Sequence, residues 1–299
     1  MSSVWIEAAL NGPWGRYRQA GIPVTVAEIV SDGLAAANAG AAIIHVHAYD
    51  SASGQQRDEW ETYARIIEGI RSKVDVIVYP TIPLAGSEFA ASNAQRRFAH
   101  TAELAKRGLI EWTVVDPGSV NFVRYDQAKT SSDSFVYQNS LSDIREGLRV
   151  ALQYQLHPGY AIYEPGFTRL GAALAHDMAN LATPIYRLMF SDEFAWGFPA
   201  NPVYLEAHLE LLRNLVPDAP WMVAGLGVDI RGNRARRPCP RWTRRRAVGD
   251  ATDEPPMGRR GHAPDPRKSR RTRECSGSQG KPQRDRLATE GPVFSLTVR

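Results

Sequence analysis

The chain has 299 residues, 43% of them hydrophobic and 23% charged, which allows one large globular domain or two small ones. The formal net charge of +4 hides a division: residues 1–230 contain 17 Lys and Arg against 25 Asp and Glu, whereas residues 231–299 contain 19 against 7. The sequence has no run of 18 apolar residues and no basic-then-apolar start, so it predicts neither a membrane span nor a signal peptide. Both cysteines, Cys239 and Cys275, lie in the basic part, which excludes a disulfide framework from residues 1–230. We therefore expect a soluble cytoplasmic protein.

Short apolar runs alternate with amphipathic stretches along the first 230 residues. The apolar runs predict seven strands, at residues 5–10, 42–47, 74–81, 109–116, 160–164, 185–191 and 221–225. Near-continuous apolar runs of this kind are typical of parallel strands that are covered on both faces. The stretches between them predict six helices, at residues 24–39, 58–72, 91–107, 142–155, 168–180 and 202–215. This alternation indicates repeated strand–helix–strand units.

Two α/β folds compete for this pattern. A Rossmann fold requires a glycine-rich turn that leads from the first strand straight into a helix, with an acidic residue about 20 positions later. Here the first strand ends in Asn-Gly-Pro-Trp-Gly at residues 11–15, and no helix follows directly. Polar residues instead lie at the strand ends along the whole series, where the active site of a (β/α)8 barrel lies: Asn11, His45, His47, Thr81, Asp116, Glu164 and Ser191. The sequence therefore favours an α/β (β/α)8 TIM-type barrel over residues 1–230, truncated after strand seven.

Two histidines, His45 and His47, end the second predicted strand. Residues i and i+2 of a strand face the same side, so both imidazoles can point into the mouth of the barrel. Two neutral imidazoles there suit Zn²⁺ or another divalent metal. One of them could instead pack as a core residue, but the spacing favours a metal half-site. We expect surface positions for the other histidines of this part, which fall in predicted helices or loops: His100, His157, His176 and His208.

Further candidate site residues follow the other strands. Glu164 ends the fifth strand, where a carboxylate costs free energy unless it meets a cation, a metal or a substrate, so a catalytic role is favoured over a structural ion pair. Asp116 and Ser119 follow the fourth strand and are candidates for substrate binding, although Asp116 could equally cap a turn. Asn11 and Thr81 supply neutral polar groups that could orient a carboxylate or carbonyl, or serve turns.

Residues 231–299 have a different character: they contain two Leu, three Val, one Phe and no Ile, and 17 of their 19 cations are Arg. Such a composition predicts a disordered tail. An abrupt enrichment in Arg, Pro and Gly also results when GC-rich coding DNA is translated in the wrong reading frame. When residues 232–244 are back-translated with degenerate codons and the DNA is read one nucleotide later, the codons permit a helical sequence that ends in Gly-Gly. We therefore favour a frameshift as the origin of the tail. An arm that binds nucleic acid through its Arg clusters is an alternative, weakened by the scarcity of aromatic residues among them.

Six segments together carry a resemblance to a known family. They are Ala-Ala-Leu-Asn-Gly at 8–12, Pro-Val-Thr-Val-Ala-Glu-Ile at 23–29, Ala-Gly-Ala-Ala-Ile-Ile-His-Val-His at 39–47, Gly-Ser-Val-Asn-Phe at 118–122, Tyr-Glu-Pro-Gly at 163–166 and Trp-Met-Val-Ala-Gly-Leu-Gly at 221–227. Their order, over about residues 3–230, resembles that of the β-keto acid cleavage enzymes, the family of 3-keto-5-aminohexanoate cleavage enzyme. The two-histidine strand is the most specific of these matches.

The resemblance implies a (β/α)8 barrel in which His45 and His47, with a Glu from strand eight, hold Zn²⁺. It implies a reversible Claisen-type cleavage, in which a β-keto acid and acetyl-CoA as co-substrate give acetoacetate and a new acyl-CoA. Thr81 falls in the segment that holds the keto-acid end of the substrate, and Glu164 resembles a pocket carboxylate of the family. Zn²⁺ would act as a Lewis acid on the keto oxygen and stabilise the enolate. We also expect a homo-oligomer if the barrel is intact.

Two features depart from the family pattern. The lysine-degradation enzyme has an acidic residue near the position of Trp14, so its absence here argues against an amino-bearing substrate. The strand-eight segment, an Arg followed shortly by Gly-x-Glu-Asp, is absent, which removes the third metal ligand and leaves open sheet edges, so the chain as given could be inactive. Two alternatives stay open: another metal-dependent carbon–carbon lyase or hydrolase on the same barrel, and a barrel remnant with a nucleic-acid-binding arm.

Overall fold

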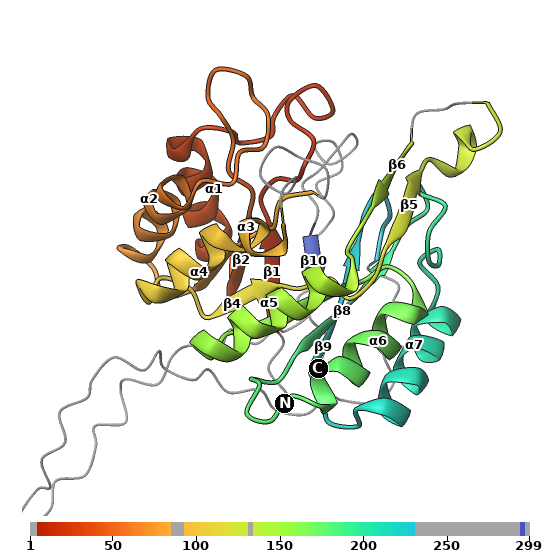
Figure 1. Cartoon of the computed structure of the whole chain (residues 1–299). Coiled ribbons are helices and arrows are strands. Elements are labelled where there is room, and N and C mark those ends of the chain that lie inside the picture. Colours follow the sequence, from red (N-terminus) through yellow and green to blue (C-terminus); the bar gives the residue numbers. More distant parts are fainter. Residues whose placement is uncertain (1–4, 85–92, 131–133, 231–293, 297–299) are drawn as a thin grey trace, which may run out of the picture.

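The computed structural model describes residues 5–84, 93–130, 134–230 and 294–296, which form a curved sheet surrounded by helices (Figure 1). Seven parallel strands of this sheet correspond to the seven predicted ones: β1 (Ile6–Ala9), β2 (Ile43–Val46), β3 (Ile77–Pro80), β4 (Trp112–Val114), β7 (His157–Ile162), β8 (Ile185–Phe190) and β9 (Trp221–Gly225). The predicted α/β fold with parallel strands is therefore confirmed.

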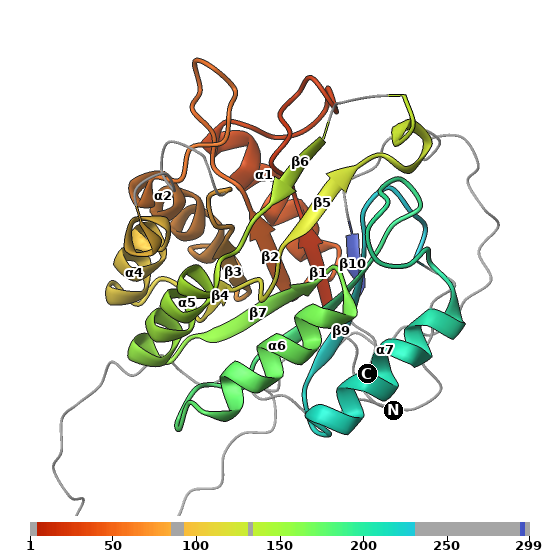
Figure 2. The same ribbon diagram turned by 45° about the vertical axis from the view of Figure 1, so that its right-hand side comes forward.

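The helices lie on the outer face of the sheet (Figure 2). They are α1 (Val26–Asn38), α2 (Trp60–Arg71), α3 (Ala94–Arg97), α4 (Ala99–Lys106), α5 (Leu141–Tyr154), α6 (Pro165–His176) and α7 (Pro202–Leu215). Thr25 begins α1 and Ser140 begins α5, each through a capping box that satisfies backbone N–H groups of the first turn. None of the helices in the described ranges has the length and apolar composition needed to cross a membrane.

A two-stranded antiparallel hairpin interrupts the series after β4. Its strands are β5 (Val120–Val123) and β6 (Ser134–Tyr137), with a short 3-10 turn (Tyr125–Gln127) between them. The hairpin rises from the carboxyl-end rim of the main sheet (Figure 2). The sequence indicated only an unusually long interval between the fourth and fifth predicted strands, so this hairpin was not predicted.

The tail contributes one short strand to the main sheet. Strand β10 (Phe294–Leu296) pairs antiparallel with both β1 and β9 and lies between them, so the sheet order is β3-β2-β1-β10-β9-β8-β7-β4. These three residues depart from the expectation of a disordered tail. Residues 231–293 and 297–299 lie outside the described part of the chain, so the expectations for them stay predictions. The two end strands also lie near each other, because the rings of Tyr79 on β3 and Trp112 on β4 are 5.6 Å apart.

The expectation of surface histidines is wrong for three residues. His100 on α4 is buried and its Nε2 lies 2.8 Å from the carbonyl oxygen of Thr81. His208 on α7 is buried against the rings of Phe190 and Phe198. His157 is buried in β7, which begins three residues earlier than predicted. Only His176 of this group is exposed, at the end of α6.

Candidate active site

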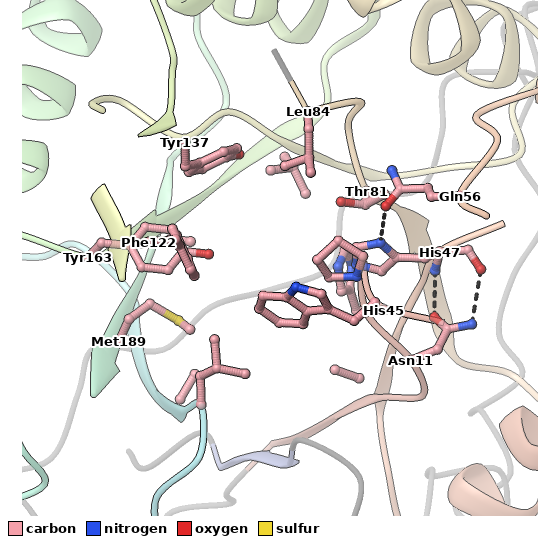
Figure 3. A pocket seen from close by; sticks show the side chains of 18 of the residues that line it. Asn11, His45, His47, Gln56, Thr81, Leu84, Phe122, Tyr137, Tyr163 and Met189 are labelled. Carbon is pink, nitrogen blue, oxygen red and sulfur yellow. Dashed lines mark hydrogen bonds between the residues drawn. The ribbon is translucent and has the colours of Figure 1, made fainter. Parts of the chain in front are cut away.

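A cavity of about 480 Å³ opens at the carboxyl ends of the parallel strands. This is the position at which barrels and related α/β folds carry their active sites. Its lining includes five of the residues singled out from the sequence: Asn11, His45, His47, Thr81 and Asp116. They come from β2 and from the segments after β1, β2, β3 and β4, and Figure 3 shows the first four.

The two imidazoles of His45 and His47 lie side by side in this cavity. Their ring centroids are 5.2 Å apart and the rings are nearly perpendicular. Burial lowers the pKa of both histidines, and repulsion from the protonated form of His47 and from Arg187 lowers that of His45 further. Both rings are therefore neutral near pH 7, which is the form of histidine that binds a metal.

The ring of His47 is oriented by a chain of polar side chains. Its Nδ1 lies 2.8 Å from Oε1 of Gln56, and Nε2 of Gln56 donates to Asp58 over 2.8 Å. Tyr63 donates to the other oxygen of Asp58. Because the Gln56 nitrogen is directed to a carboxylate, its oxygen faces His47 and accepts a hydrogen bond from the Nδ1–H group. This assigns the tautomer in which Nε2 of His47 carries the free lone pair.

Asn11 fixes the backbone at the end of β2. Its Oδ1 accepts from the N–H of His47 over 2.7 Å, and its Nδ2 donates to the carbonyl oxygens of His47 and Pro23. Figure 3 shows the paired bonds to His47. Since these bonds occupy one lone pair and both donors of the amide, Asn11 acts chiefly as a positioning residue for His47.

Asp116 lines the cavity beside Tyr137 and Ala161. Its Oδ1 accepts from the N–H of Ala161, and its Oδ2 accepts from the hydroxyl of Tyr137 on the hairpin. Burial raises the pKa of Asp116 to about 6 despite these two bonds. The site therefore contains a carboxyl group that exchanges a proton just below neutral pH.

A buried ion pair that the sequence analysis missed lies in the floor of the cavity. Glu7 on β1 and Arg187 on β8 approach to 3.3 Å, and Tyr79 on β3 donates to Glu7. Glu7 and Arg187 each interrupt an otherwise apolar strand, and charged side chains in such positions are rarely buried unless they are paired. That interruption was the signal that could have identified the pair.

Two of the predicted site residues do not line the cavity. Glu164 lies directly before α6, and its Oε1 accepts from the backbone N–H of Gly197 over 2.9 Å. Ser119 is exposed, and its hydroxyl exchanges hydrogen bonds with the backbone of Asn139. Both side chains therefore hold loops beside the cavity.

The donor chemistry of the histidine pair fits a zinc ion. The two rings are neutral and adjacent, and Nδ1 of His45 is buried without a hydrogen-bond partner. Across the described ranges, no three His, Cys, Asp or Glu side chains are grouped so that they could hold a metal together. The pair therefore supplies two nitrogen ligands, and the remaining positions of a bound metal would be open to oxygen ligands.

Comparison with known proteins gives a family and several curated relatives, of which two are described. The model of the β-keto acid cleavage enzyme family matches residues 3–232. The 3-oxoadipate:acetyl-CoA acetyltransferase of Cupriavidus necator is 25% identical over 226 residues, which cover 75% of this chain and 72% of that protein. The 3-dehydrocarnitine:acetyl-CoA trimethylamine transferase of Rhizobium meliloti is 27% identical over 241 residues, which cover 75% of each protein.

Solved structures share the fold at lower similarity. The binary complex of ObcA with oxaloacetate superimposes with a TM-score of 0.51 at 13% identity, over 69% of this chain and 51% of that one. The chain thus spans about half the length of that structure. The likeness at this identity shows a related fold alone.

Proposed function

The chain belongs to the β-keto acid cleavage enzyme family, and we propose that it transfers acyl groups between a β-keto acid and acetyl-CoA. The observation that carries the proposal is the pair of neutral imidazoles, His45 and His47, in the cavity at the strand ends of a chain that matches this family. The names of the two relatives described above both include acetyl-CoA.

The proposed reaction is an exchange. The bond between C2 and C3 of the β-keto acid breaks, and so does the bond between the acetyl carbonyl and the sulfur of CoA. The two-carbon carboxylate fragment joins the acetyl group to form acetoacetate, and the released acyl group joins the sulfur. No net oxidation occurs, and the products contain all the atoms of the two substrates.

We assign His45 and His47 as ligands of Zn²⁺. The ion would supply a Lewis acid for the keto oxygen. Gln56 and Asn11 hold His47 in place for this task. Thr81 and Asp116 are assigned to binding the keto acid, Asp116 with a proton that it gains just below neutral pH. Glu164 and Ser119 are assigned to holding the loops beside the cavity, on the evidence of their hydrogen bonds.

An isotope experiment tests the exchange. The purified full chain is incubated with zinc, a β-keto acid and acetyl-CoA labelled with ¹³C in its acetyl group, and the products are separated by mass spectrometry. The proposal requires the label in acetoacetate and an unlabelled new acyl-CoA. Turnover that needs no acetyl-CoA would overturn it and favour another lyase or hydrolase. The double variant His45→Ala/His47→Ala is the control and should give neither product.

We also propose that residues 1–230 form an incomplete (β/α)8 barrel and that residues 231–299 derive from a frameshift. Two observations support this idea: the Arg-rich composition of the tail, and the point at which the alternation of apolar strands and amphipathic helices stops, shortly after β9. Reading the coding DNA through codons 225–245 tests it. The idea would be contradicted if these codons form one uninterrupted reading frame and the frame shifted by one nucleotide encodes no apolar strand or helix.

A further inference from the structure

The cavity wall that faces the histidine pair is apolar and largely aromatic. Figure 3 shows Phe122, Tyr137, Tyr163 and Met189 across the cavity from His45 and His47. A substrate whose keto-acid end lies at the histidines would therefore place the rest of its chain against this wall.

The aromatic wall is tightly packed. The ring of Phe122 stacks on that of Phe135 at 5.0 Å and meets the rings of Tyr163 and Phe194 edge-on, at 5.4 Å and 5.1 Å. Rings that support one another in this way form a firm apolar surface. Such a surface gains free energy when it covers alkyl or aryl groups, and it offers no counter-charge to a carboxylate.

The charged side chains at the mouth of the cavity form ion pairs with one another. Glu193 accepts from Arg18 through one oxygen, at 2.6 Å, and from Arg124 through the other, at 2.9 Å. The guanidinium of Arg18 also lies over the rings of Trp14 and Phe194, at 4.4 Å and 5.5 Å from their centroids. Glu193 is thus held between two cations, and a cation already covers these aromatic faces.

The remaining charged residues that line the cavity have partners as well. Glu7 pairs with Arg187, and Asp116 accepts from Tyr137. A second carboxylate on the substrate would therefore have to compete with Glu193 and Asp126 for the two arginines of the mouth. A substrate ammonium group would have to compete with Arg18 both for Glu193 and for the ring of Trp14.

Resting on the function proposed above, we propose that the β-keto acid used by this chain carries an uncharged, apolar chain beyond its keto group. The substrate class is thus a short or medium-chain 3-oxo acid. It differs from the two substrates that appear in the names of the relatives, a dicarboxylic acid and a quaternary ammonium compound. Glu193 is the residue that sets this preference, because it pairs with both arginines of the mouth and, together with Asp126 on Arg124, balances their two charges.

A matched pair of acids tests the preference. 3-Oxohexanoate and 3-oxoadipate have the same six-carbon skeleton and differ only by a terminal carboxylate. With the zinc-loaded full chain and acetyl-CoA, kcat/KM for 3-oxohexanoate should exceed that for 3-oxoadipate by about 100-fold or more, because a buried charge is left uncompensated. 3-Oxooctanoate should gain roughly fourfold per added methylene. Equal or better use of 3-oxoadipate or 3-dehydrocarnitine would overturn the proposal.

Two matched variants test the part played by Glu193. Glu193→Gln should raise kcat/KM for 3-oxoadipate by about tenfold, since both arginines lose a negative partner. Glu210→Gln removes an exposed carboxylate that pairs with Arg213 on α7, away from the cavity, and it should leave the preference unchanged. An unchanged 3-oxoadipate value in Glu193→Gln would overturn the assignment of Glu193.

Measuring the binding of the two acids distinguishes a failure of this inference from a failure of the proposed function. If no acid supports acyl transfer, the proposed function fails. Calorimetric titration of the same chain with 3-oxohexanoate and 3-oxoadipate, without acetyl-CoA, then still measures which acid binds more tightly. Tighter binding of 3-oxohexanoate supports an apolar substrate chain, and equal or tighter binding of 3-oxoadipate contradicts it.

Discussion

Oε1 of Gln56 lies 2.8 Å from Nδ1 of His47, while the nitrogen of the same amide lies 2.8 Å from a carboxylate oxygen of Asp58. The amide therefore has a fixed direction, and it leaves Nε2 as the nitrogen of His47 that can bind a metal. Partners of this kind orient the ligands of many metal sites and strengthen their basicity.

Replacing Gln56 should weaken zinc binding while leaving the fold intact. In Gln56→Ala the ring of His47 loses its orienting acceptor, so the zinc affinity should fall by about 10- to 100-fold. Competition with a chelating dye measures this affinity. Gln55→Ala is the matched control, because Gln55 is exposed and should keep the affinity of the unaltered chain. Equal affinities in the two variants would show that Gln56 does not act on the metal.

The buried pair of Glu7 and Arg187 should show strong coupling in stability. Removing one partner leaves the other charge buried without compensation, so Glu7→Leu and Arg187→Met should each lower the free energy of unfolding by about 3–5 kcal/mol. The double variant should lose much less than the sum of the two, because it buries no charge. Urea unfolding of the four proteins measures the coupling, and additive losses would contradict it.

Asp116 should make stability depend on pH between about 4 and 6. Its pKa in the folded chain is raised to about 6 from the ordinary value of 3.8, so the native state holds a proton that the unfolded chain has already released. The free energy of unfolding should therefore fall as the pH rises through this window. The raised pKa also makes Asp116→Asn gain stability relative to the unaltered chain over the same range.

Urea midpoints of both proteins at pH 4.5, 5.5, 6.5 and 7.5 give this difference directly. A difference that stays constant with pH would show that Asp116 titrates normally. Other carboxylates contribute equally to both proteins, and Glu28 and Asp50, whose pKa values are lowered to about 2, titrate well below the window.

The spacing of apolar residues predicted the main helices and strands because it reflects which side chains are buried. The seven parallel strands are buried on both faces and read as apolar runs, and α7 has the bounds predicted for it, since Asn201 and Pro202 mark its start. The β5–β6 hairpin was missed because most of β6 is exposed, so the apolar signal is weak. His100 and His208 were misplaced because a single polar residue on the inner face of a helix does not change its apolar pattern.

The cavity lining was predictable at the strand ends, and most directly where one strand carries two polar residues. His45 and His47 share a face by spacing alone, so their joint position in the cavity followed from the sequence. The partners Glu7 and Arg187 are 180 positions apart, and their contact depends on the curvature of the sheet. Glu164 has the right place along its strand but lies one position beyond Tyr163, which does line the cavity. Neighbouring residues near a strand end point to opposite sides, which explains the difference.

Zinc content tests the central claim that His45 and His47 form a metal site. The purified full chain is equilibrated with zinc, dialysed and analysed by mass spectrometry for bound metal, beside His45→Ala/His47→Ala and the control His176→Ala, which alters an exposed histidine. Circular dichroism verifies that all three proteins are folded. The account predicts one zinc per chain in the unaltered protein and in His176→Ala, and none in the double variant. Absence of zinc from the unaltered chain, or equal zinc in the double variant, would contradict it.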